Sequence, residues 1–120
     1  MIKLWKLLAP KFDNHARHRV SLTNGLMEKF QNGRKIEEMK FIDVSEVHYA
    51  QYTDNQIIFE FFDIEGNGFV VSKSWKGSSQ VLQHLIARIS NGTDEEIKLM
   101  SDAMLSKDFG PKLFWQRREL

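Results

Sequence analysis

The chain has 120 residues, of which 42% are hydrophobic and 28% charged, and its formal net charge is +1. These values fit one folded domain with its own core and exclude a disordered tail or a bundle of membrane helices. There is no cysteine, which excludes a disulfide framework, a thiolate nucleophile and a cysteine-ligated metal, and which fits the reducing cytoplasm.

We expect residues 1–18 to form a short helix and a loop at the start of a single domain that spans residues 1–120. The segment from Met1 to Ala9 resembles a signal peptide only superficially, because Lys6 interrupts the apolar run and no small-residue cleavage site follows. We expect it to pack on the domain. The alternative is weak association with an anionic membrane surface through Trp5 and the flanking lysines.

Two histidines in this part of the chain have the spacing of metal ligands. His15 and His18 would share one face of a helix. However, Asp13 is the one acid nearby, and Arg17 and Arg19 would repel a cation. The sequence therefore favours a polar loop without a metal, and we expect no cofactor.

Residues 19–75 show the pattern of about six short antiparallel strands. Asn24-Gly25 and Asn32-Gly33 predict tight hairpin turns, because both residue types tolerate a positive φ. The later strands are indicated by alternation around Val47 and Tyr49, by residues 57–62, and by residues 69–73 after a glycine-containing turn.

The strand over residues 57–62 predicts two distinct faces. Ile57, Phe59 and Phe61 share one parity, which we assign to the core. Ile58, Glu60 and Phe62 share the other, which we expect to be exposed unless something covers it. The cover would be the second helix, the pair Phe114-Trp115 or a partner protein.

Two helices are expected after the strands. A stripe formed by Val81, Leu82, Leu85, Ile86 and Ile89 predicts a helix over residues 78–90. Thr93 to Glu96 has the form of a capping box, so a second helix begins there and runs to about residue 107. Residues 112–120 then form an aromatic and basic tail, with no predicted strand.

This order resembles the pleckstrin-homology-like small barrels of bacterial proteins. The resemblance covers roughly residues 19–90 and rests on Val20 to Leu26 as the opening strand and turn, on the segment Phe41 to Val47, on the hairpin at 57–74, and on the helix that ends near Ile89. It implies an α+β fold, in which an antiparallel bent sheet or small barrel is capped by a helix, with residues 91–120 added as a helix and tail. It also implies a binding platform and carries over no functional residue.

No group of residues has the pattern of a catalytic centre. Glu37 and Glu38 are adjacent on a strand and point to opposite faces, so they cannot converge as an acid and base pair. The serines lack a nucleophile elbow, and the Gly66-Asn67-Gly68 turn lies between two strands, unlike a phosphate-binding loop. We therefore do not expect an enzyme.

The sequence favours a cytoplasmic protein-binding module, and the specific version of this hypothesis is an immunity-type inhibitor that neutralises a toxin or enzyme. If the partner is a nuclease, the blocking surface should be acidic, and the acids around the central hairpin are the candidates: Asp54, Glu60, Asp63 and Glu65. Ile58, Phe62, Phe114 and Trp115 are the apolar candidates for partner contact. Nucleic acid is a weaker alternative, because the basic residues at the two ends form a thin electrostatic footprint.

Overall fold

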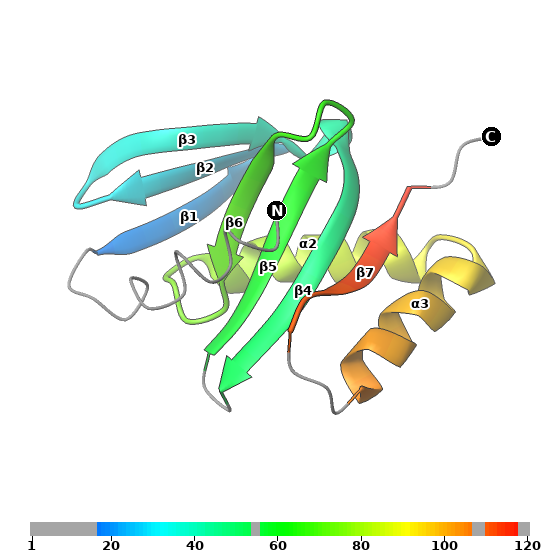
Figure 1. The fold of residues 1–120 in the computed structure, drawn as a ribbon. Helices are drawn as coiled ribbons and strands as arrows, with labels where there is room; N and C mark the ends of the chain where they lie inside the picture. Colours follow the sequence, from blue (N-terminus) through cyan, green and yellow to red (C-terminus); the bar gives the residue numbers. More distant parts are fainter. Residues whose placement is uncertain (1–16, 54–55, 107–109, 118–120) are drawn as a thin grey trace.

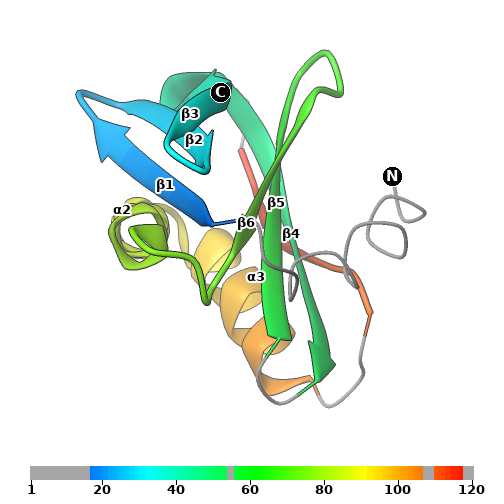
Figure 2. The same cartoon turned by 90° about the vertical axis from the view of Figure 1, so that its left-hand side faces the viewer.

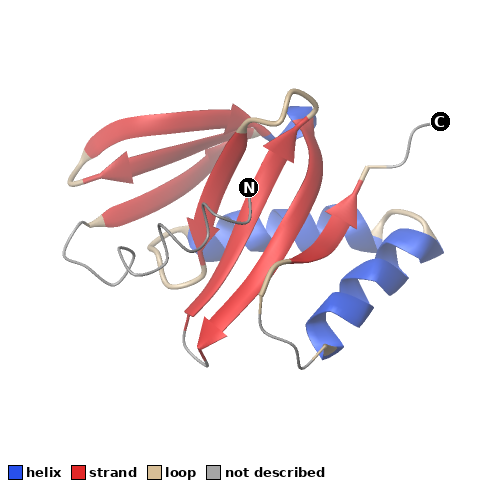
Figure 3. Ribbon diagram, in the orientation of Figure 1, coloured by secondary structure: helices blue, strands red, loops and turns tan. Residues whose placement is uncertain are grey.

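The computed structural model describes residues 17–53, 56–106 and 110–117, which form two antiparallel sheets and two helices (Figures 1 and 3). The first sheet has the order β1-β2-β3 and consists of β1 (His18–Thr23), β2 (Leu26–Gln31) and β3 (Arg34–Lys40). The second has the order β6-β5-β4-β7 and consists of β4 (Val44–Thr53), β5 (Gln56–Asp63), β6 (Gly68–Ser72) and β7 (Lys112–Gln116). The 3-10 helix η1 (Phe41–Asp43) links the sheets, and α2 (Ser78–Ser90) and α3 (Asp94–Leu105) precede β7.

The predicted fold class is confirmed: the protein is α+β, with bent antiparallel sheets capped by a helix. The described strands form two separate sheets and do not close into a barrel. Both Asn-Gly turns have the expected backbone, with φ of 52° at Asn24 and Asn32 and of 78° and 83° at the glycines that follow. The sharp reversals that these turns allow set the register of the first sheet.

Each helix begins where the local chemistry favours it. The Thr93 hydroxyl accepts a hydrogen bond from the Glu96 N–H, and the Glu96 carboxylate accepts one from the Thr93 N–H, which completes the predicted capping box of α3. Before α2, Gly77 has φ of 85°, and a Cβ there would lie 1.9 Å from the carbonyl oxygen of Val20. Glycine is thus required where the chain passes β1 to enter α2.

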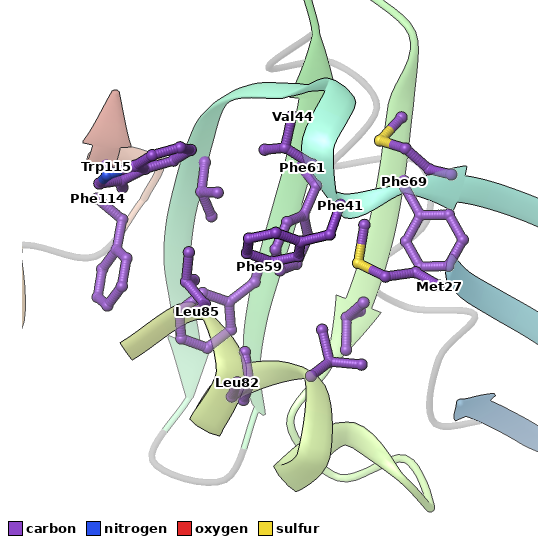
Figure 4. Packing of buried hydrophobic residues seen from close by; sticks show 14 of the residues in the cluster. Met27, Phe41, Val44, Phe59, Phe61, Phe69, Leu82, Leu85, Phe114 and Trp115 are labelled. Atoms are coloured by element: carbon purple, nitrogen blue, oxygen red, sulfur yellow. The ribbon is translucent and has the colours of Figure 1, made fainter. Parts of the chain in front are cut away.

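The core lies between α2 and the sheets. Phe59 and Phe61 of the second sheet form one buried cluster with Leu82 and Leu85 of α2, as the sequence predicts, and Phe69 of β6 belongs to the same cluster (Figure 4). Met27 enters from the first sheet, so that one cluster joins the two sheets and the helix. Ile86, which the helical stripe includes, is partly exposed at the edge of this cluster.

The C-terminal tail differs from the prediction. Lys112–Gln116 is a strand that pairs with β4, with Trp115 opposite Val47. Phe114 and Trp115 are buried, and the Phe114 ring lies edge-on against Phe59 at 5.2 Å between centroids. Neither side chain is available to a partner or to nucleic acid, which corrects their assignment as contact residues.

The second face of β5, which the sequence predicts to be exposed unless something covers it, is buried. Ile58 and Glu60 are 0% exposed and Phe62 is 4% exposed. Helices α2 and α3 lie on the opposite side of the sheet, so they are not the cover (Figure 2). Residues 57–62 are apolar at all but one position, which is the pattern of a strand buried on both faces, and parity alone did not reveal this.

Candidate functional site

A cleft of about 490 Å³ is lined by residues of η1, of the start of β4, of the β5–β6 turn and of the end of β7. Four acidic side chains line it: Asp43, Glu46, Asp63 and Glu65. Ile42 and Ile64 also line it and are 76% and 83% exposed. Exposed aliphatic side chains beside charged ones are typical of a surface that binds another protein.

The turn that carries Ile64 is fixed by hydrogen bonds to Asp63. Its Oδ1 accepts from the backbone N–H groups of Glu65 and Asn67, at 3.0 and 2.8 Å, and its Oδ2 accepts from the Asn67 side chain at 2.9 Å. The bond from the Asn67 side chain, supported by the backbone donors, lowers the pKa of Asp63. The carboxylate therefore stays charged at neutral pH and holds Ile64 in a defined place.

Ile42 is held from the other end of the chain. The Arg117 guanidinium donates to the carbonyl oxygen of Ile42 at 2.9 Å and to that of Val44 at 2.7 and 3.0 Å. The Arg117 N–H also donates to the Ser45 carbonyl at 2.8 Å. Since these bonds fix the chain on both sides of Asp43, β7 positions one wall of the cleft. A surface that is ordered before binding loses less entropy when a partner docks.

The acidic character extends beyond the cleft. A neighbouring hollow of about 430 Å³ shares Asp43 and Asp63 with it and adds Glu37 and Glu38 from β3. Cations temper this charge. Lys40 lines the hollow and Arg117 lines the cleft, while Lys29 pairs with Glu37 at 2.8 Å and Lys35 pairs with Glu38. The net effect is a negative edge that attracts cationic groups.

Two of the four acids expected on a blocking surface lie in the cleft, namely Asp63 and Glu65. Asp54 lies outside the described residues, as does the predicted helix from Met1 to Ala9. Glu60 is buried in the sheet. Two of the predicted acids, both at the β5–β6 turn, thus line the cleft. The other two carboxylates of the cleft come from Asp43 and Glu46 and not from Glu60.

Glu60 is an internal carboxylate. The strand register places it between His48 of β4 and Val70 of β6. Neither of its oxygens has a hydrogen-bond partner in the described part of the chain. A Cβ at Gly68 would lie 2.7 Å from its Oε2, so the glycine makes room for the carboxyl group. Burial raises the pKa of Glu60 to about 7, although the charge of Lys29 opposes the shift.

The residues considered for catalysis or metal binding are dispersed. Across residues 17–53, 56–106 and 110–117, no group of three or more His, Asp or Glu side chains could hold a metal ion. His15 lies outside these residues, and His18 stacks on Trp75 at 4.4 Å between ring centroids. His48 contacts Glu46 at 3.1 Å and Phe62 at its ring edge. None of the helices in the described segments is long and apolar enough to cross a membrane.

Comparison with models of protein families, with curated proteins and with solved structures finds no match for this chain. The cleft therefore has to be interpreted from its own geometry. Sequence reasoning used Phe41 to Val47 only as part of the resemblance and did not identify Ile42 as a contact residue. The available signal was the polar Asp43 and Ser45 directly after Ile42, which interrupt the apolar pattern of a strand.

Proposed function

We propose that this protein is a non-catalytic binding module that docks its acidic cleft on a basic surface of a partner protein. The observation that carries the proposal is the pair Ile42 and Ile64, both exposed and both held by hydrogen-bonded turns beside four carboxylates. A few residues that become buried contribute most of the affinity of an interface, and the surrounding charges set orientation and association rate.

The partner class that fits best is an enzyme or toxin that acts on a polyanion. Its active site must be basic to bind its substrate, and a negative cleft with two apolar anchors can cover such a site. This corresponds to the inhibitor or immunity type of protein. The cytoplasm is the compartment we propose, because the chain has no cysteine.

The strand order supports a related proposal about architecture. Six antiparallel strands in two sheets are followed directly by α2, which packs on their inner faces. This is the arrangement that the resemblance to pleckstrin-homology-like domains implies. In this proposal, α3 and β7 are additions, and their role is to place Arg117 against Ile42.

The test is a quantitative capture experiment from the native host with three forms of the full chain: wild type, Ile42→Ser/Ile64→Ser, and Ile36→Ser. Ile36 is the matched control, because it is a 47% exposed isoleucine on β3 that does not line the cleft. We expect the wild type and the control to retain the same protein and the double variant to lose it. Equal recovery by all three forms would refute the proposal.

A further inference from the structure

A second recess, a groove, is lined by residues of α2, α3, β5 and β7 and by Lys73, which follows β6. It measures about 280 Å³ and shares no residue with the acidic cleft. Its floor is formed by four core side chains, Phe59, Leu82, Leu85 and Phe114, which lie together between sheet and helix (Figure 4). Its rims carry Ile86 and the 57% exposed Met104.

The walls of this groove are strongly apolar, but one part of it is polar and positive. Lys73 is the one charged side chain among the described residues that line it. Ser78 and Ser79, in the first turn of α2, line it as well, and the Ser78 hydroxyl donates to the Lys73 carbonyl at 2.7 Å. Lys73 and the start of α2 are therefore adjacent.

The start of α2 adds to the positive character. Its N-cap, Gly77, makes no side-chain hydrogen bond, and the first turn contains no acid. The partial positive charge of the helix N-terminus is thus not balanced by a side chain of the first turn. Together with Lys73, it favours an anionic group at this part of the groove.

The size of the groove distinguishes between two kinds of occupant, a helix of a partner protein and a narrow ligand. A helix with its side chains is about 10 Å across, and a stable protein interface buries about 800 Å² on each side. Two turns of such a helix occupy roughly 800 Å³, several times the groove's volume of about 280 Å³, so a helix cannot be taken up by it. Along α2, the distance from Ser78 to Ile86 is about 12 Å at 1.5 Å per residue, which suits one extended alkyl chain.

We propose that this groove binds a single-chain amphiphile with a carboxylate head, taken from solution, with the head at Lys73 and the tail along Leu82, Ile86 and Met104. The thioether of Met104 is flexible and polarizable, so it can close over tails of different length. This inference rests on residues outside the acidic cleft and is independent of the proposed function.

The test is a titration of the isotope-labelled full chain with octanoate, followed by two-dimensional NMR. We expect saturable shifts of the Ser79, Gln83 and Ile86 amides and of the Met104 methyl group. Octanol, which lacks the charge, should bind about threefold more weakly, a difference of about 0.7 kcal/mol that lies within the range of exposed ion pairs. Acetate, which lacks the tail, should cause no saturable shift.

Four variants assign the two ends of the ligand. Lys73→Gln should weaken octanoate about threefold and leave octanol unchanged, whereas Lys76→Gln, an exposed lysine outside the groove, should change neither. Met104→Gln should weaken both ligands, whereas Leu105→Gln, at the neighbouring exposed position, should not.

Three results would overturn the inference. The first is the absence of saturable shifts with octanoate. The second is binding that responds equally to the groove variants and to their controls. The third is a shift of the same residues by vesicles of anionic phospholipid without any response to octanoate, which would identify a bilayer as the occupant.

Discussion

The indole Nε1 of Trp115 donates a buried hydrogen bond of 2.7 Å to Oε1 of Glu96, which joins the last strand to the first turn of α3. The other oxygen of this carboxylate caps the helix by accepting the Thr93 N–H at 2.8 Å. The guanidinium groups of Arg88 and Arg117 each lie 5.5 Å from the Trp115 ring. One carboxylate therefore joins α3 to β7, and Arg117, which follows β7, lies at the cleft.

Glu96→Ala should lower the free energy of unfolding by about 2–4 kcal/mol, because it removes a helix cap and leaves a buried indole N–H unpaired. Glu96→Gln is the comparison variant: its amide has one acceptor oxygen where the carboxylate uses two, so it can keep one of the two bonds and should cost less than Glu96→Ala. Urea denaturation of the three proteins measures the difference. Equal stability of the alanine variant and the wild type would contradict the role of Glu96.

Glu60 should make stability fall as the pH rises from about 4.5 to 7. Burial raises its pKa to about 7, so the folded state holds its proton where the unfolded state has lost it. Below about pH 4.5 Glu60 is protonated in both the folded and the unfolded state, so it does not lower the stability there. Above pH 7 the full cost, on the order of 3 kcal/mol, opposes folding.

Glu60→Gln should remove this dependence. The variant should match the wild type near pH 4 and exceed it by about 1–3 kcal/mol at pH 8, because no buried group has to ionise. Glu65→Gln, at an exposed position in the next turn, controls for a general effect of charge. Stability curves of wild type and Glu60→Gln that run parallel from pH 4 to 8 would contradict the account.

Substitution of Glu37 should lower the stability of the protein more than substitution of its partner Lys29. Lys29 is buried, its Nζ lies 4.6 Å from the Phe69 ring centroid and 2.8 Å from Glu37, and burial lowers the pKa of this lysine. Lys29→Met replaces the ammonium by an apolar group and should be nearly neutral. Glu37→Ala leaves the cation without its partner and should cost about 1–3 kcal/mol. Thermal unfolding of the two variants measures the difference. A Lys29→Met variant that is less stable than Glu37→Ala would contradict this prediction.

The variant Arg117→Met tests whether partner binding depends on the fixed position of Ile42 or only on the charge of the cleft. Removing the cation makes the cleft more acidic, so charge alone predicts stronger binding to a basic partner. Loss of the bonds to the Ile42 and Val44 carbonyls predicts weaker binding, because the wall is no longer fixed. We expect reduced partner recovery and a modest loss of stability, of about 1 kcal/mol. Increased recovery would show that Arg117 does not position Ile42.

The parts of the fold that sequence could predict are those set by neighbouring residues. The Asn-Gly turns, the Thr93 capping box and the stripe of α2 each depend on chemistry within a few residues, and each appears as expected. Strand β7 was missed because its pairing is not local: Trp115 lies opposite Val47, far back in the chain. A strand this short acquires its structure from its neighbour in the sheet.

The cleft was only partly predictable for the same reason. Asp63 and Glu65 belong to one turn and were identified there, whereas Asp43, Glu46 and Arg117 join them only after the two sheets and β7 have assembled. Glu60 was misplaced because the alternation of β5 shows which residues share a face and does not show whether that face is covered.

Amide hydrogen exchange of the protein with and without its captured partner tests the central claim most directly. If Ile42 and Ile64 anchor the interface, residues 42–46 and 63–67 should exchange more slowly in the complex, while residues 94–105 of α3 and the β1–β2 turn stay unchanged. Slowed exchange confined to α3 or to the first sheet, with residues 42–46 and 63–67 unaffected, would contradict the account.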